Sequence, residues 1–153
     1  MIKFCFSCSY PDSRQYKAVI MEAATEALKY ENCFENYEIS ITLTDDEQIH
    51  QYNKQFRNKD KATDVLSFPL SDQSEGLKKN PDNNCYMLGD IVISIDTAAR
   101  QAKENLQSLE REIAFLTIHS VLHLLGYDHE TSEEDEKEMF SKQDEIIHRI
   151  YAV

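Results

Sequence analysis

Residues 109–129 read LEREIAFLTIHSVLHLLGYDH, and this stretch says more about the fold than any other part of the chain. Its apolar positions, Ile113 and Leu116 among them, recur at helical spacing and cover most of the circumference of a helix. A helix that is apolar nearly all round must be buried by other parts of the chain. The stretch therefore predicts a largely buried helix from Leu109 to Leu125 that ends before Gly126.

The segments around this helix show two kinds of periodicity. Apolar residues alternate as in strands over residues 2–8, 37–44 and 87–93. A short apolar run at 65–68 is stopped by Pro69, which fits a strand end or an edge strand. Helical spacing recurs over residues 13–29, 96–105 and 132–151. These elements predict one α+β domain over residues 1–153, in which about five helices pack on a small mixed sheet.

Two of the expected helices carry more detailed predictions. Thr44 and Glu47 stand three apart as in a capping box, so a helix should begin there, bury Ile49, Tyr52 and Phe56, and deliver Arg57 at its end. The final helix should bury one apolar stripe. Its members are Met139, Phe140, Ile146, Ile147 and Ile150. Residues 71–84 show no period and are expected to form a mobile loop, such as a lid.

Composition indicates a folded protein that stays inside the cell. The 153 residues are 41% hydrophobic and 29% charged, and eight Tyr and seven Phe argue against a disordered acidic chain. No run approaches the roughly 18 apolar residues that cross a bilayer, and the first residues lack an apolar stretch of signal-peptide length. We therefore expect a soluble, cytoplasmic protein without a membrane partner.

The net charge of −12 weighs against indiscriminate binding to nucleic acid or anionic membrane. The distribution is uneven, however, because residues 130–145 hold eight acids against two lysines. Between residues 54 and 61 the sign reverses. Lys54, Arg57, Lys59 and Lys61 stand there against Asp60 alone. We expect this basic cluster to be the side from which a polyanion would approach.

The four cysteines are expected to be free thiols, because a domain of this size without an export signal needs no disulfides. Cys5 and Cys8 have the two-residue spacing of a zinc or redox pair. They lie, however, in a strand-like run with no second pair elsewhere, so we expect them to be buried strand residues.

The histidines of the central segment give the clearest chemical signal. His119 and His123 stand four apart on the expected helix, so both imidazoles aim at a common point. Gly126 can adopt a positive φ at the helix end and turn the chain so that His129 approaches the same point. Three protein ligands with an open position are typical of catalytic zinc, so we predict one zinc ion per chain. His50 and His148 each lie on an expected helix without a neighbouring partner, and both are expected to be ordinary polar or half-buried side chains.

Ser120 restricts the chemistry of such a site. Zinc proteases carry Glu directly after the first histidine, where the carboxylate acts as general base. A serine hydroxyl cannot serve as that base near neutral pH, so peptide hydrolysis by this route is disfavoured, although another carboxylate could reach the site. Other metal chemistry, such as polarisation of a carbonyl or phosphoryl oxygen, stays open.

Three blocks of the sequence together resemble the YbeY family of bacterial endoribonucleases: residues 53–69, 88–94 and 119–129. Ala62 and Ser120 stand where Pro and Gly would be common in that family, but neither is a proposed ligand. The resemblance implies an α+β fold and zinc held by His119, His123 and His129. It also implies cleavage of single-stranded RNA during maturation of small-subunit ribosomal RNA and in ribosome quality control, with the ribosome or its small subunit as partner. A monomer is favoured.

Arg57 is the candidate catalytic residue outside the histidines. Phosphodiester cleavage must stabilise charge on phosphoryl oxygens, and a planar guanidinium suits that task. Asp64 and Asp90 could orient a ligand histidine or a water molecule, or could be ordinary turn and strand-end residues, and Asp128 adjoins a proposed ligand. Two other functions stay open: a metallohydrolase of another class, such as a peptidase, and a noncatalytic ribosome-associated module whose metal braces the fold.

Overall fold

The computed structural model describes residues 1–70, 76–127 and 132–151. Its elements follow in the order β1 (Ile2–Cys8), the 3-10 helix η1 (Ser13–Tyr16), α1 (Lys17–Tyr30), β2 (Tyr37–Thr44), α2 (Asp46–Arg57), β3 (Val65–Pro69), β4 (Lys78–Lys79), β5 (Tyr86–Ser94), α3 (Ile95–Glu104), α4 (Leu109–Leu124) and α5 (Glu133–Ile150). Five α-helices beside a five-stranded mixed sheet confirm the predicted α+β class.

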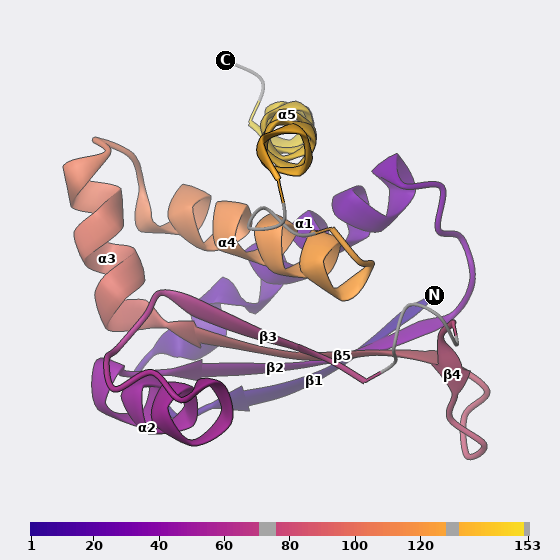
Figure 1. Cartoon of the computed structure of the whole chain (residues 1–153), viewed down its shortest axis with the longest axis horizontal. Coiled ribbons are helices and arrows are strands. Elements are labelled where there is room, and N and C mark those ends of the chain that lie inside the picture. Colours follow the sequence, from indigo (N-terminus) through magenta and orange to yellow (C-terminus); the bar gives the residue numbers. More distant parts are fainter. Residues whose placement is uncertain (71–75, 128–131, 152–153) are drawn as a thin grey trace.

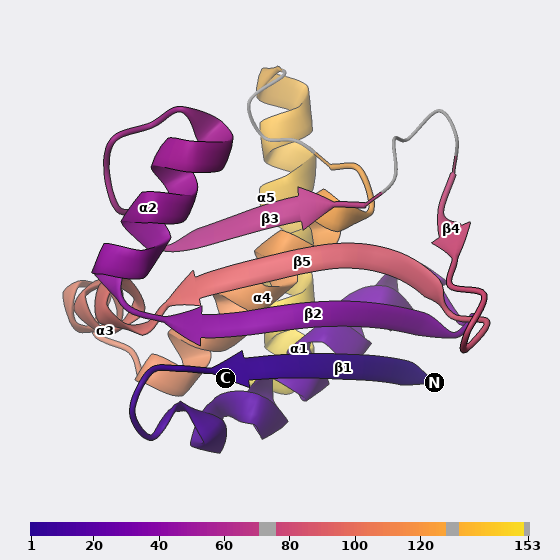
Figure 2. The same ribbon diagram turned by 90° about the horizontal axis from the view of Figure 1, so that it is seen from below.

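The sheet has the strand order β1-β2-β5-β3, and β4 pairs with the first residues of β5 (Figure 2). Strands β1, β2 and β5 run parallel, whereas β3 runs antiparallel to β5. Among the described residues β3 has no second neighbour, so it is an edge strand, as Pro69 predicts.

The helices cover the two faces of the sheet unequally. Figure 1 shows α1, α4 and α5 on one face and α2 alone on the other. Because side chains alternate along a strand, Ile91 and Ile93 of β5 enter the main core beneath α1 and α4. Val92 points the opposite way and joins Ile49 and Leu66 in a small cluster beneath α2. The face under α2 is therefore much less covered than the face under α4.

Helix α4 is the predicted central helix. It packs against α1, α3 and α5 and against the strands β3 and β5. Ten of its sixteen residues are buried, including Ile113, Ile118 and Val121. The apolar circumference noted in the sequence is thus explained by partners on several sides.

Two buried-stripe predictions and one cap prediction are wrong. Phe56 is 58% exposed and Phe140 is 40% exposed. Phe56 contacts Phe68 of the edge strand β3, and this contact leaves more than half of the side chain open. The N-cap of α2 is Asp45, whose Oδ1 accepts from the backbone N–H of Gln48 at 2.9 Å. Thr44, the predicted cap, is instead the buried last residue of β2.

The segment predicted as a mobile loop, residues 71–84, is not a loop throughout. Residues 71–75 lie outside the described part, but Lys78 and Lys79 form β4 and pair with Met87 and Tyr86. Short pairing of this kind leaves no periodic signal in the sequence.

The cysteines are free thiols, as predicted. Cys5 is exposed rather than buried, because β1 turns its side chain to the uncovered face of the sheet. Cys8 packs against the main core on the other face, so the pair does not form a joint site. No helix within residues 1–70, 76–127 or 132–151 has both the length and the apolar character needed to cross a membrane.

Candidate functional site

The structure places His119 and His123 together on the last two turns of α4. Both rings are half-buried, and their centroids lie 4.7 Å apart with an interplanar angle of 70°. The helix therefore presents two imidazoles on one side, as the four-residue spacing predicts.

The C-terminus of α4 also forms as predicted. Gly126 has φ +111°, its N–H donates to the His123 carbonyl at 3.0 Å, and the N–H of Tyr127 donates to the Leu122 carbonyl at 3.0 Å. This is a Schellman turn, which reverses the chain after the helix. The Nζ of Lys142 on α5 lies 5.0 Å from the centre of the Tyr127 ring and holds the residue after the glycine.

The third predicted ligand, His129, lies outside the described residues, and so does Asp128. Within the described ranges no three His, Cys, Asp or Glu side chains are grouped so that they could hold a metal ion. The described part of the site therefore consists of His119, His123 and the side chains that contact them.

Gln143 is a residue of this site that the sequence analysis missed. It lies on α5, is fully buried, and its Oε1 is 2.7 Å from Nδ1 of His119. A carbonyl oxygen can only accept, so Nδ1 of His119 is the donor in this contact, and in the neutral imidazole Nε2 then carries the lone pair. A signal was present: Gln143 interrupts the stripe formed by Met139, Ile146 and Ile147 with a polar side chain.

Ser120, in contrast, is fully buried and has no hydrogen-bond partner for its hydroxyl within the described chain. Its side chain does not share the half-buried side of α4 that carries the two histidines. The position that holds the general base in zinc proteases therefore points into the core.

Arg57 ends α2 at the edge of the sheet. The helix stops because Asn58 adopts a left-handed conformation with φ +59°. The guanidinium carbon of Arg57 lies 5.1 Å from the centre of the Phe68 ring, and Nη2 donates to the Ser67 carbonyl of β3. A cation–π contact and a hydrogen bond thus hold Arg57 against the edge strand.

Gly89 brings this edge of the sheet close to the end of α4. A Cβ at Gly89 would lie 2.3 Å from the carbonyl oxygen of Phe68 and 2.9 Å from Cδ2 of Leu124, the residue after His123. Only glycine permits this approach, and its φ of +146° is also one that other residues rarely adopt. Phe68, whose ring supports Arg57, and Leu124, which follows His123, therefore both approach Gly89 of β5 closely.

Of the two acidic candidates that the structure describes, Asp64 has other partners and Asp90 lies on the opposite face of the sheet from α4. Asp64 Oδ1 accepts from the backbone N–H of Val65, the first residue of β3, at 2.7 Å. When the side-chain amide of Gln101 is oriented with its nitrogen toward these acids, it donates to Asp64 Oδ2 at 3.3 Å and to Glu112 Oε1 at 3.0 Å. Burial raises the pKa of Glu112; a hydrogen bond from Gln107 opposes this rise, and the charge of Asp64 adds to it. Asp90 alternates with Ile91 and so lies on the α2 face of the sheet, opposite α4.

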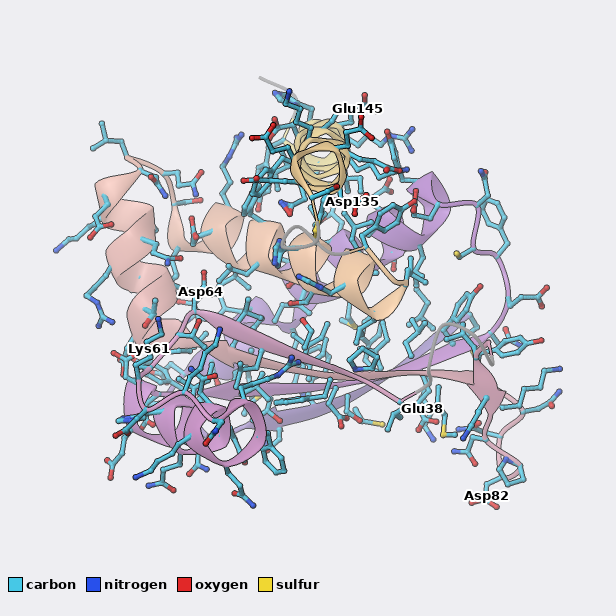
Figure 3. The ribbon with its side chains drawn as sticks, viewed as in Figure 1. Glu38, Lys61, Asp64, Asp82, Asp135 and Glu145 are labelled. Atoms are coloured by element: carbon cyan, nitrogen blue, oxygen red, sulfur yellow. The ribbon has the colours of Figure 1, made fainter. Side chains whose placement is uncertain are left out.

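The basic cluster lies in the last turns of α2 and the connection to β3. Lys54, Arg57, Lys59 and Lys61 are all exposed. Buried Asn53 shapes this connection, because its Nδ2 donates to the Lys61 carbonyl at 2.9 Å and its own carbonyl accepts from Lys59 N–H at 3.1 Å. Figure 3 shows Lys61 and Asp64 near α2, well away from Asp135 and Glu145 of α5.

The two remaining histidines have ordinary polar partners. His50 Nε2 lies 2.6 Å from Asp60 Oδ1, which helps to lower the pKa of that carboxyl, and His148 Nδ1 lies 2.6 Å from the Asp144 carbonyl oxygen. Both are polar side chains at the surface of their helices, but each has a local partner, which the sequence analysis did not anticipate.

Comparison with known proteins gives one consistent result. The family model described as "Endoribonuclease YbeY" matches residues 7–151. A protein of that name from Bacillus cereus is 45% identical over 134 residues, which cover 87% of this chain and 85% of the relative. Another from Persephonella marina is 48% identical over 134 residues, which cover 88% of this chain and 83% of the relative.

A solved structure agrees with these matches. The solution structure of TM1509 from Thermotoga maritima superposes with a TM-score of 0.65 at 28% identity and covers 99% of this chain and 90% of that chain. The family match spans the paired histidines of α4 as well as Arg57 on α2. The chain therefore belongs to the YbeY family of endoribonucleases.

Proposed function

We propose that this protein is a zinc-dependent endoribonuclease that cuts single-stranded RNA. Its substrate is the precursor of small-subunit ribosomal RNA, and the same activity serves ribosome quality control in the cytoplasm. The protein acts as a monomer on the ribosome or its small subunit. The observation that carries the proposal is the family match over residues 7–151, because it includes every predicted site residue.

His119, His123 and His129 would hold the zinc ion. The donor chemistry of the described residues fits this role, since the hydrogen bond from His119 Nδ1 to Gln143 leaves Nε2 unprotonated. Bound zinc supplies a Lewis acid for charge that develops on a phosphoryl oxygen. Gln143 in turn keeps the imidazole of His119 in one tautomer and one orientation.

Arg57 would bind the phosphate at the cleavage position. One of its nitrogens is engaged by the Ser67 carbonyl, and the Phe68 ring covers one face of the guanidinium. A guanidinium has five N–H donors, so others stay available for two oxygens of a phosphate. The support from β3 fixes the side chain before substrate arrives, which lowers the entropy cost of binding.

The test uses purified, metal-analysed protein with precursor ribosomal RNA. We expect His123→Ala to lose both zinc and cleavage. Arg57→Ala should keep its zinc and lose about 100-fold or more in cleavage rate, because a charge-stabilising donor is gone. Arg57→Lys should recover only part, since an ammonium lacks the planar fork.

Arg14→Ala is the matched control, because Arg14 is exposed in η1 next to β1, at the opposite edge of the sheet from β3. This variant should cleave at the wild-type rate. Arg57 would be a structural residue if Arg57→Ala unfolded at a much lower temperature while the folded molecules cleaved normally. Zinc-loaded wild-type protein that bound the small subunit without cutting RNA would instead indicate a noncatalytic module.

A further inference from the structure

Phe56 leaves most of its ring in solvent although it ends an amphipathic helix. The side chain is 58% exposed. Its ring is nonetheless fixed, because the centroid lies 6.2 Å from that of Tyr52 and 5.6 Å from that of Phe68, the latter at an interplanar angle of 68°. Edge-to-face contact with Phe68 supports one part of the ring and leaves the rest open. A rigid, open aromatic surface loses little entropy when a second ring stacks on it.

The charge around Phe56 sets it apart from the other exposed phenylalanines. The Phe68 ring that supports Phe56 also carries the guanidinium of Arg57, at 5.1 Å. Lys54 and Lys59 are exposed on either side in the sequence, and Asp60, the acid of this segment, is engaged by His50. Phe34, 71% exposed, follows Cys33 and precedes Glu35, and Phe140 belongs to the acidic helix α5.

We propose that the Phe56 ring stacks against a nucleobase of the RNA strand, while Arg57 and the neighbouring lysines hold the phosphates on either side of that nucleotide. This inference rests on the proposed function and adds to it the part of the surface that tells a single strand from a duplex. An unpaired base offers its π face to an aromatic ring, whereas a paired base is covered by its neighbours in the helix. The basic residues supply attraction that does not depend on sequence, and the aromatic ring supplies the preference for unpaired bases.

The absence of tryptophan from the sequence permits a direct test. Phe56→Trp introduces a single tryptophan at the proposed stacking position, which can be excited selectively at wavelengths that the eight tyrosines do not absorb. On stopped-flow mixing with a short single-stranded RNA, before cleavage, its emission should be quenched strongly, and the same RNA annealed to its complement should quench it little. Phe34→Trp places the same reporter at a more exposed position beside an acid, where neither RNA should change the emission.

Affinity measurements give a second, independent readout. Phe56→Ala should bind single-stranded RNA about tenfold more weakly, with an unchanged dependence on salt, because stacking releases no counterions. Lys59→Ala should reduce the salt slope by about one, as expected for a lost phosphate contact. Phe56→Leu keeps an apolar side chain without a π face and should bind as weakly as Phe56→Ala, whereas Phe34→Ala should bind as wild type.

The outcomes separate this inference from the function on which it rests. Wild-type protein that binds no RNA at all would overturn the proposed function. If the wild-type protein binds RNA and both Phe56→Ala and Phe56→Leu bind it as tightly as the wild type, the stacking role alone is overturned. Equal quenching of Phe56→Trp by single-stranded and duplex RNA would also overturn it.

Discussion

The role that we assign to Gln143 depends on one hydrogen bond, between its side chain and His119. Its Oε1 accepts from His119 Nδ1 at 2.7 Å, while its own Nε2 has no hydrogen-bond partner among the described residues. An unsatisfied buried amide nitrogen costs about 1–3 kcal/mol. We infer that a site which tolerates this cost at full burial gains something else from the side chain, namely a fixed tautomer of His119.

We therefore predict that Gln143→Leu lowers zinc affinity about 10–100-fold, the usual effect of losing a group that orients a ligand histidine. Gln143→Glu keeps an acceptor at the same place and should retain wild-type affinity or exceed it. Competition with a chromogenic chelator measures both. Ile147→Val is the control, because Ile147 is buried in the same helix and shortening it should lower stability while leaving the zinc affinity unchanged. Equal affinities for Gln143→Leu and wild type would remove Gln143 from the site.

Among the elements, α2 carries Phe56 and Arg57 but rests on a small apolar cluster. Its N-terminus is held by polar contacts instead. Oδ1 of Asp46 accepts from the hydroxyls of Ser94 and Thr97 at 2.6 Å each, and Oδ2 accepts from Arg100 at 2.8 Å. Burial alone would raise the pKa of Asp46, but these three hydrogen bonds outweigh it and lower the pKa. The carboxylate thereby fastens α2 to the start of α3.

This contact predicts a dependence of stability on pH. A carboxyl whose folded-state pKa is lowered stabilises the protein above its unfolded pKa of about 4 and loses that contribution as the pH falls through the folded-state pKa. Asp46→Asn should therefore lower the free energy of unfolding by about 1–3 kcal/mol at neutral pH. The difference from wild type should shrink below about pH 4.

Urea denaturation across this pH range measures the effect. Asp82→Asn makes the same chemical change at an exposed turn residue and should match wild type throughout. A deficit in Asp46→Asn that stays constant down to the lowest pH would show that the side chain acts by packing rather than by charge.

Sequence patterns predicted some of these elements and contacts but not others. Helix α4 and its Gly126 turn were predictable, because apolar spacing and a turn glycine are local signals that tertiary structure did not override. The exposure of Phe56 was not predictable, because helical spacing identifies the apolar face of a helix but not how much of that face another element covers. Asp45 and Thr44 are both good caps, and the burial of Thr44 at the end of β2 decided between them. The contact between Gln143 and His119 joins residues 24 apart and leaves only a polar interruption in the sequence.

Acidic and basic side chains are concentrated in two separate regions of the molecule. The first turn of α5 holds Glu133, Glu134, Asp135 and Glu136, whereas the basic cluster lies at the end of α2, on the other side of the sheet (Figures 1 and 3). With a net charge of −12, a polyanion is repelled from most of the surface. We therefore expect the basic cluster to select the orientation in which RNA approaches.

We predict that charge reversal by Lys59→Glu and Lys61→Glu together weakens RNA binding and lowers the slope of log affinity against log salt by about two or more. Neutralising Glu133→Gln and Glu134→Gln on α5 should leave the slope unchanged, because α5 and the basic cluster lie on opposite sides of the sheet. Binding titrations at several salt concentrations measure both slopes. An unchanged slope in the lysine double variant would mean that RNA approaches another face.

The contact between α5 and His119 has a consequence for how the protein is made. A ribosome releases the chain from its amino end, so the four strands of the main sheet path and α4 leave before residue 143 does. A nascent chain of that length would already hold His119, but the ring would be free to rotate and to take either tautomer. The nuclease would thus leave the ribosome with the orientation of His119 not yet fixed, and premature termination ahead of α5 would release a product in which this histidine lacks its hydrogen-bond partner Gln143.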